Sequence, residues 1–233
     1  MEIAKSNKTA LLFGASGLVG SKVLEFLLMH PAYSKVKIFV RRKLDISHEK
    51  LEQHIINFSK IWSYQLLMKG DDLFLCLGTT MAKAKSKESF YRVDFTYNFK
   101  TAEVACEVGV NQVFLVSSVD ASPTSRVFYL RVKGELEEAV KHLPFWSVHI
   151  FRPSLLLGER NENRWGEEAA AKIGRVLNKV LGGLLMKYKP VEADIVAKAM
   201  VQAAQKLQSG VHYYPSNYLQ ELAEENDRQL RNT

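Results

Sequence analysis

Tyr129 and Lys133 are the side chains whose types and spacing most directly suggest chemistry. Residues four apart lie one turn apart on the same helix face, so the two side chains meet if this segment is helical. An ammonium beside a phenol stabilises the phenolate, and such a phenol can exchange a proton with a carbonyl or an alcohol. The same pair also occurs by chance on solvated helix faces, so its place in the chain must support the interpretation.

Ser117 and Ser118 help to define that place, because they follow an apolar run at 113–116 and a short loop joins them to the Tyr/Lys pair. The carboxyl ends of parallel strands are where open α/β sheets bind their ligands. Consecutive residues of a strand face opposite ways, so only one of the two hydroxyls can point into a cleft. Ser118, one step further beyond the strand, is the first choice to orient a substrate, with Tyr129 as proton donor and Lys133 as its electrostatic partner.

A glycine-rich segment follows the first apolar run and opens an amphipathic stretch at 18–29. Glycine lets the backbone approach a pyrophosphate closely, and the free N–H groups and dipole at a helix start stabilise the anion. A turn that only packs a helix against a strand would use the same glycines, but the strand–turn–helix context near the N-terminus favours dinucleotide binding. The predicted phosphate-binding residues are Gly14, Ser16, Gly17, Leu18, Val19 and Gly20.

The end of the second apolar run indicates which dinucleotide to expect. In NAD-binding units an acidic residue at this point binds the ribose hydroxyls. Here the run ends in Arg41, Arg42 and Lys43, with no carboxylate until Asp45. Guanidinium groups bind a 2′-phosphate bidentately, although two arginines in an exposed loop would look the same in the sequence. The sequence therefore predicts NADP(H), bound by Arg41 and Arg42.

Short apolar runs alternate with longer helical stretches along the chain. This alternation predicts an α/β fold with a doubly wound parallel sheet, the Rossmann fold, covered by helices on both faces. Such a sheet brings the Ser, Tyr and Lys side chains to the same edge as the glycine-rich turn. The expected strands are 10–13, 36–40, 54–58, 73–77, 113–116 and 147–151, and the expected helices are 18–29, 90–108 and 134–142.

The 233 residues are expected to form a single NAD(P)-binding Rossmann domain, because no repeat and no low-complexity linker divides them. The stretch 159–190 has a different character, being rich in Asn and Arg and then helical with a break at Gly182-Gly183. We expect this stretch to form a small C-terminal cap over the substrate cleft, beside the carboxyl ends of the strands.

Composition and charge narrow the classes of partner. The net charge of +7 invites nucleic-acid binding, but no nucleic-acid-binding motif is visible and scattered lysines are typical of solvated helix faces. A nucleic acid is therefore not an expected partner. No apolar run reaches the ~20 residues that cross a bilayer, so a membrane is not an expected partner either. The chain has two cysteines, Cys76 and Cys106, which predicts no disulfide scaffold and a cytoplasmic location. The histidines lack the spacing of metal ligands, so no bound metal is expected.

These motifs together resemble the atypical short-chain dehydrogenases/reductases and, within them, the Tat-interacting oxidoreductase group. The resemblance runs from Lys8 to about Arg164, and the Gly-x-x-Gly-x-x-Gly spacing is part of it. Its landmarks are Gly-Ala-Ser-Gly at 14–17, Arg41-Arg42, Cys-Leu-Gly-Thr-Thr at 76–80, Val93-Asp94, Ser117-Ser118, Tyr129-Leu130-x-Val132-Lys133-Gly134-Glu135 and Phe151-Arg152-Pro153.

The resemblance implies that Tyr129 and Lys133 are the active-site pair. It also implies further cofactor contacts at Leu77, Gly78, Leu156 and Arg164. The sequence departs from the wider superfamily in two places: 76–80 replaces the usual Asn-Asn-Ala-Gly, and Asp94 stands where a helix Asn is usual. A proton relay through that Asn is therefore expected to be altered or absent.

The leading hypothesis is an NADP(H)-dependent oxidoreductase that reduces a carbonyl or a similar small molecule by hydride transfer. Retention of both Tyr129 and Lys133 favours this enzyme over an NADP(H)-sensing regulatory protein with little catalysis. A sugar-nucleotide epimerase on the same fold ranks last, because the short C-terminal region leaves little room for a nucleotide sugar. A small-molecule substrate is expected, and association as a homodimer or with another protein is compatible with the sequence.

Overall fold

The main sheet has seven strands, all parallel, in the order β3-β2-β1-β4-β5-β6-β9. The computed structural model of the protein describes residues 5–157 and 188–231, with side chains as far as residue 225. The strands are β1 Lys8–Phe13, β2 Tyr33–Val40, β3 Leu51–Ile55, β4 Asp72–Leu75, β5 Gln112–Val116, β6 Ser147–Arg152 and β9 Gly210–Pro215. The chain reverses its winding direction between β1 and β4, so the predicted doubly wound fold is confirmed.

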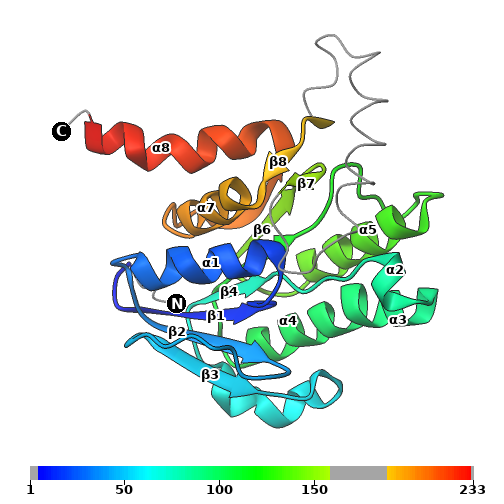
Figure 1. Cartoon of the computed structure of the whole chain (residues 1–233), viewed down its shortest axis with the longest axis horizontal. Helices are drawn as coiled ribbons and strands as arrows, with labels where there is room; N and C mark the ends of the chain where they lie inside the picture. Colours follow the sequence, from blue (N-terminus) through cyan, green and yellow to red (C-terminus); the bar gives the residue numbers. More distant parts are fainter. Residues whose placement is uncertain (1–4, 158–187, 232–233) are drawn as a thin grey trace.

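Helices cover both faces of this sheet (Figure 1). On one face lie α1 Leu18–Met29, α7 Ala193–Ala203 and α8 Leu219–Arg231. On the other lie the 3-10 helix η1 Phe58–Met68, α4 Asn98–Glu107 and α5 Phe128–Lys141. The short helices α2 Met81–Ala84 and α3 Lys87–Tyr91 and the π-helix η2 Arg92–Tyr97 precede α4, and η4 Ser216–Tyr218 precedes α8.

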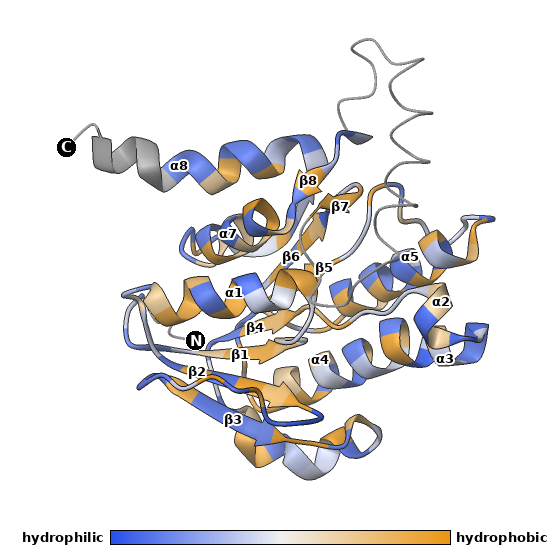
Figure 2. Ribbon diagram, viewed as in Figure 1, coloured by the Kyte–Doolittle hydropathy of each residue, from blue (hydrophilic) through white to orange (hydrophobic). Residues whose placement is uncertain are grey.

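Two apolar cores result, one on each face. The strands at the centre of the sheet are largely apolar, whereas the edge strand β3 and the outer surfaces of the helices are largely hydrophilic (Figure 2). One core joins β1, β2 and β6 to α1 and α7, and the other joins the opposite strand faces to η1, α4 and α5. Burial of apolar surface at ~25 cal/mol per Å² on both faces is what holds the carboxyl edge of the sheet in one arrangement.

Three predicted elements differ in the structure. The helix predicted at 134–142 is α5, which begins earlier, at Phe128, and ends at Lys141. The third strand is Leu51–Ile55 rather than 54–58, because it is an edge strand of half-buried residues. The apolar residues that follow it, Ile56 and Phe58, leave the sheet and pack under η1. The predicted helix 90–108 is three segments, since the π-helix η2 lies between α3 and α4.

The structure adds strands that the apolar pattern did not indicate. β9 pairs with β6 at the far edge, and a small second sheet joins β7 Leu156–Leu157 to β8 Val191–Glu192. Most of the predicted cap at 159–190 lies outside the described residues. No helix in the described part of the chain has the length and apolar character of a membrane span.

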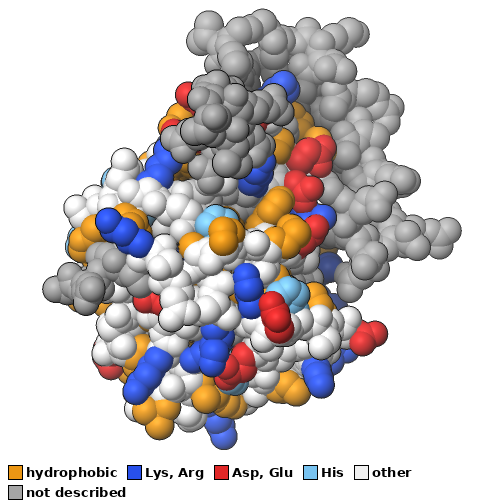
Figure 3. Space-filling view, turned by 90° about the vertical axis from the view of Figure 1, so that its left-hand side faces the viewer, with side chains coloured by type: hydrophobic (Ala, Val, Ile, Leu, Met, Phe, Trp, Pro, Cys, Tyr) orange, Lys and Arg blue, Asp and Glu red, His pale blue; other side chains and the backbone are white. Residues whose placement is uncertain are grey.

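The amino ends of the strands lie opposite the edge at which the predicted site residues gather. There Lys8 forms a buried ion pair with Asp72, which also accepts hydrogen bonds from Tyr33 (2.6 Å) and Gln112 (2.8 Å). The surface on this side carries basic and acidic side chains interspersed (Figure 3). The buried polar cluster therefore connects the starts of four strands. The predicted site residues lie at the opposite edge of the sheet.

Candidate active site

The glycine-rich turn brings the ends of β1 and β4 into close contact. Gly14 has φ of +93°, a conformation that L side chains rarely adopt, and a Cβ at this position would overlap the carbonyl oxygen of Cys76. A Cβ on Gly20 would in turn overlap the carbonyl oxygen of Gly14. Glycine is therefore required here for helix α1 to start directly behind the ends of both strands.

The amino terminus of α1 has the properties of an anion site. Gly17 occupies the N-cap position without a side-chain hydrogen bond, and the first turn holds no acidic residue. The Gly17 N–H donates to the Gly14 carbonyl (2.8 Å), which closes the turn and leaves the following N–H groups directed outward. Ser16 is exposed and Leu18 half-buried, whereas Val19 and Gly20 are buried against the sheet. The helix dipole and these N–H groups together favour a phosphate.

A pocket of ≈ 740 Å³ lies at the carboxyl ends of β2, β3 and β4, and we call it the strand-end pocket. Arg41, which follows β2, lines it together with Lys83 of α2 and Arg92 of η2. Three basic side chains from separate elements thus converge on one cavity, which suits a phosphate. Arg42 is exposed but is not among the residues that line this pocket.

Lys133 lies in the same region, on helix α5, and its ammonium binds a second buried side chain. Its Nζ is 2.9 Å from Oδ1 of Asp94, and the two side chains are 6% and 1% exposed. The other oxygen of Asp94 accepts the Thr79 backbone N–H (2.9 Å), and Thr79 lines the strand-end pocket. A Cβ on Gly78 would lie 3.9 Å from the Lys133 Nζ, so the turn after β4 runs directly over the ion pair.

The charges around Lys133 keep it protonated. Burial acts to lower the pKa of Lys133, but the carboxylates of Asp94 and Glu137 and the nearby Tyr129 phenol outweigh burial, so the pKa of Lys133 is raised above its ordinary value. Tyr129 is therefore within electrostatic reach of Lys133, as their spacing on α5 predicts. The Tyr129 ring is half-buried and packs against Phe90, with 5.7 Å between the ring centroids.

The two serines after β5 have different surroundings. The buried hydroxyl of Ser117 donates to Glu137, which also receives a bidentate pair of hydrogen bonds from Arg152. Ser117 is thus part of a network that fixes α5 to β6. Ser118 is half-buried, and its hydroxyl makes no hydrogen bond within the described chain. The hydroxyl of Ser117 is therefore engaged within the protein, and the role of Ser118 toward a substrate stays a prediction.

The π-helix η2 positions Asp94. An extra residue in the turn breaks the regular hydrogen bonding, and the two amide protons of the buried Asn98 are shared among the carbonyls of Leu77, Val93 and Asp94 at 3.1–3.2 Å. The same side chain therefore fixes η2 to the turn after β4. Because Asn98 holds both segments, it aligns Asp94 with Lys133.

The remaining predicted contacts are only partly located. Leu77 is half-buried against the α4–α5 core, and Leu156 is half-buried in β7 against the α1–α7 core. Arg164 lies outside the described residues. Cys76 is inert at neutral pH, because burial raises the pKa of its thiol to about 12 despite the nearby Lys133 charge.

Several site residues were not predicted from the sequence. Glu137 stands one turn beyond Lys133 on the same helix face, and that spacing could have indicated it. Lys83 and Arg92 join Arg41 only through the tertiary fold, so no local pattern shows them. In the described residues no group of side chains could hold a metal ion.

No protein-family model matches the chain. Curated relatives do match it. It is 40% identical over 170 residues to HTATIP2 of Rattus norvegicus, a match that covers 71% of this chain and 70% of that protein. It is also 34% identical to FMP52 of Candida albicans, which covers 85% of this chain and 88% of the relative.

Solved structures share the fold at low sequence identity. A UDP-N-acetylglucosamine 4-epimerase from Methanobrevibacter ruminantium has a TM-score of 0.67 at 14% identity, covering 96% of this chain and 83% of the epimerase. The Bordetella bronchiseptica enzyme WbmH, solved with NAD+, has a TM-score of 0.68 at 13% identity, covering 96% and 81%. Identities this low show a common fold and assign no substrate.

The expected cytoplasmic location is wrong by these comparisons. Fungal relatives that are 33–36% identical over 85% of the chain are named as mitochondrial proteins. The prediction rested on cysteine usage. Low cysteine content marks a reducing environment, which is not unique to the cytoplasm.

Proposed function

Because the chain belongs to the HTATIP2 group of atypical short-chain dehydrogenases/reductases, we propose that it is an NADP(H)-dependent oxidoreductase that reduces a carbonyl or similar small electrophile. The observation that carries the proposal is the order of groups along the carboxyl edge of the sheet. Arg41, the glycine turn, Gly78 and Ser118 follow β2, β1, β4 and β5, which are neighbours in that order. They span about 14 Å at the usual strand spacing, as an elongated ligand requires.

The residues present fit a dinucleotide with a 2′-phosphate. Arg41, Lys83 and Arg92 would hold that phosphate in the strand-end pocket. The uncapped start of α1 would hold the pyrophosphate, and the close approach of Gly14 to Cys76 leaves no side chain in its way. Lys133 would donate hydrogen bonds to the ribose hydroxyls next to the nicotinamide. Leu156 and Arg164 remain further proposed contacts from the family resemblance.

The chain's own groups then have defined roles. When bound, the cofactor supplies a hydride to an electrophilic carbon. Ser118 orients the carbonyl oxygen, and Tyr129 donates its phenolic proton to that oxygen. Lys133 stabilises the resulting phenolate by its positive charge, and Asp94 fixes the ammonium in place. The Glu137–Arg152 pair holds α5 so that Tyr129 and Lys133 keep their positions.

The direct test is NADPH oxidation across a panel of aldehydes, ketones and quinones, followed at 340 nm. We expect turnover of at least one class by the wild type and a loss of a hundredfold or more in kcat for Tyr129→Phe. Tyr213→Phe is the matched control, because its exposed phenol lies on the edge strand β9 and should change nothing. Tight NADPH binding without any turnover that depends on Tyr129 would instead support a cofactor-sensing regulator.

A further inference from the structure

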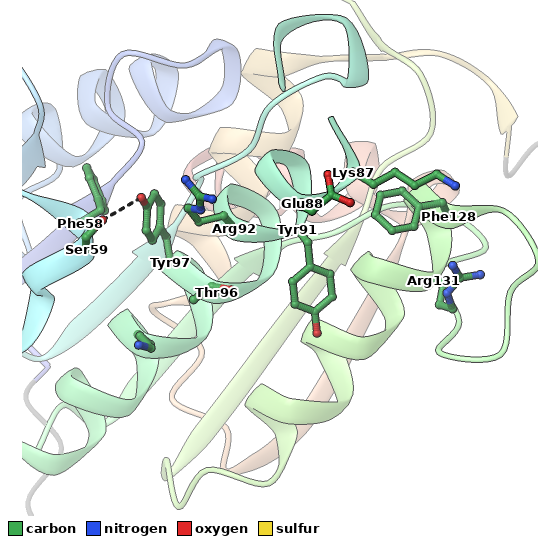
Figure 4. A pocket seen from close by; sticks show the side chains of 11 residues that line it. Phe58, Ser59, Lys87, Glu88, Tyr91, Arg92, Thr96, Tyr97, Phe128 and Arg131 are labelled. Carbon is green, nitrogen blue, oxygen red and sulfur yellow. Dashed lines mark hydrogen bonds between the residues drawn. The ribbon is translucent and has the colours of Figure 1, made fainter. Parts of the chain in front are cut away.

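A second pocket, of ≈ 660 Å³, opens between α3, η2, α4 and α5, and we call it the outer pocket. Figure 4 shows its two ends: Phe58 and Tyr97 stand at one, and Phe128 with Lys87 and Arg131 stands at the other. The Tyr91 ring projects between them. None of the residues given a role in hydride transfer lines this cavity, so the proposed reaction does not explain it.

The outer pocket is strongly basic. Lys87, Arg92, Lys100 and Arg131 line it against a single carboxylate among its described lining residues, that of Glu88. Lys87, Arg92 and Lys100 have no ion pair within the described part of the chain. Glu88 is occupied at the start of α3, where hydrogen bonds from its own backbone and from Ser86 lower its pKa. Such a concentration of positive charge repels itself and is relieved by a bound anion.

The walls of the pocket are aromatic. Phe58, Tyr91, Tyr97 and Phe128 present rings to it, and two of the cations lie over one of these rings. The Lys87 ammonium and the Arg131 guanidinium each stand 5.6 Å from the centre of the Phe128 ring. Aromatic rings pack well against another flat ring system, and the cations beside them can bind an acidic group. The pocket therefore suits a flat molecule that bears an acidic group.

We propose that the outer pocket binds a small aromatic or conjugated anion, a carboxylate, sulfonate or phosphate ester, at the same time as the cofactor. The ring system lies among Tyr91, Tyr97 and Phe128, and the acidic group is held by Lys100 and Arg92. Arg92 also lines the strand-end pocket, where Tyr97 and Phe58 are shared as well. The two ligands therefore meet at a common wall, and each is expected to alter the affinity for the other.

The test uses 8-anilinonaphthalene-1-sulfonate, an aromatic sulfonate whose fluorescence rises on binding, titrated with and without saturating NADP+. We expect saturable binding that persists with NADP+ present. Lys100→Glu should weaken it at least fivefold, because Lys100 lines only the outer pocket. Lys69→Glu is the matched control, since it makes the same charge change at an exposed site that lines neither pocket. Tyr91→Leu should weaken binding of the probe without changing the net charge of the protein.

Amide chemical shifts locate the probe, and the expected changes fall in 87–100 and 128–131. Equal affinity of Lys100→Glu and the wild type would overturn the proposal, as would complete displacement of the probe by NADP+. Sedimentation gives a further criterion: if the wild type is a dimer that Lys100→Glu dissociates, the pocket is covered by a second copy of the chain and the proposal is wrong. The Lys100 comparison is made without cofactor as well, so a failure of NADP+ to bind would not affect it.

Discussion

At the scale of single residues, Lys133 connects helix α5 to the π-helix η2 through its ion pair with Asp94. Its ammonium is buried beside the Asp94 carboxylate, and the Glu137 carboxylate adds negative charge from one turn further along the same helix face. A buried charge without a partner is strongly unfavourable, so Asp94 stabilises the charged form that the proposed reaction needs. The wider superfamily has an amide at this position, and the carboxylate here makes the contact with the lysine a direct ion pair.

Asp94→Asn should lower the free energy of unfolding by about 3 kcal/mol at pH 7, because it leaves the Lys133 charge buried without its partner. The measurement is urea unfolding followed by circular dichroism. Lys133→Met should also destabilise the protein, since it leaves the carboxylate unpaired. The double variant should be more stable than the two losses added together predict. Simple additivity would contradict a coupled ion pair.

Arg41 and Arg42 differ in the structure, although the sequence treats them alike. Arg41→Gln should weaken NADPH binding about tenfold to a hundredfold, the value of a charge-assisted contact of 1.5–3 kcal/mol, and leave NADH binding nearly unchanged. Arg42→Gln, which does not line the pocket, is the matched control and should have a smaller effect. Isothermal titration of both cofactors measures this. Equal losses for the two cofactors would argue against a 2′-phosphate at Arg41.

At the scale of elements, the π-helix η2 is what places Asp94. Its extra residue lets the side chain reach both Thr79 and Lys133, and Asn98 satisfies the carbonyls that the distortion leaves without helical partners. π-helical turns are costly and are frequent at functional sites. The buried Asn98 amide therefore ties this element to the turn after β4.

Asn98→Leu removes the buried amide NH2 group, whose two protons serve the carbonyls of Leu77, Val93 and Asp94, and should lower the free energy of unfolding by about 2 kcal/mol or more. It should also weaken NADPH binding, because η2 carries Asp94 and Arg92. Gln205→Leu is the control, because it removes donated hydrogen bonds at the opposite edge of the sheet: it should lower the free energy of unfolding by about 1 kcal/mol and leave NADPH binding unchanged. Normal cofactor affinity in Asn98→Leu would contradict a positioning role for η2.

The sequence could predict the elements that rest on local patterns. Helix 18–29 and the strands next to it follow from periodicity and glycine spacing. The bounds of the helix agree with the structure, whereas the two strands begin earlier than predicted, at Lys8 and Tyr33. The π-helix could not be predicted, because 90–108 has a continuous helical pattern and the distortion depends on a contact between Asn98 and Leu77, far along the chain. The edge strand β3 was misplaced because half-buried residues give a weak apolar signal. Lys83 and Arg92 reach Arg41 only through the sheet order.

At the scale of the whole molecule, the stability of the sheet depends on buried polar groups as well as on its two cores. His149 on β6 stacks on Phe114 of β5 and His212 of β9, and its ring nitrogens hydrogen-bond Ser147 and Tyr214 at 2.9 Å. Burial, with smaller contributions from His212 and Lys8, lowers the pKa of His149 to about 3. The folded protein therefore holds this ring neutral between β5 and the edge strand β9.

This shift makes stability depend on pH in a defined direction. Below the ordinary pKa of 6.5, His149 is protonated in the unfolded chain but stays neutral in the folded protein. The free energy of unfolding therefore falls as the pH falls from 6.5 toward 3. Between pH 7.5 and 5 the free energy of unfolding of the wild type should fall by about 2 kcal/mol through His149, and the His149→Gln variant should lack this decrease. His142→Gln is the control at an exposed histidine. Parallel pH curves for wild type and His149→Gln would contradict the assignment.

The central claim is that the carboxyl edge of the sheet binds a nicotinamide dinucleotide through its additional phosphate. Calorimetric titration of the wild-type protein with NADPH and with NADH tests this most directly. The account predicts one site per chain and an affinity for NADPH at least tenfold greater than that for NADH. No heat of binding for either dinucleotide, or tighter binding of NADH, would contradict it.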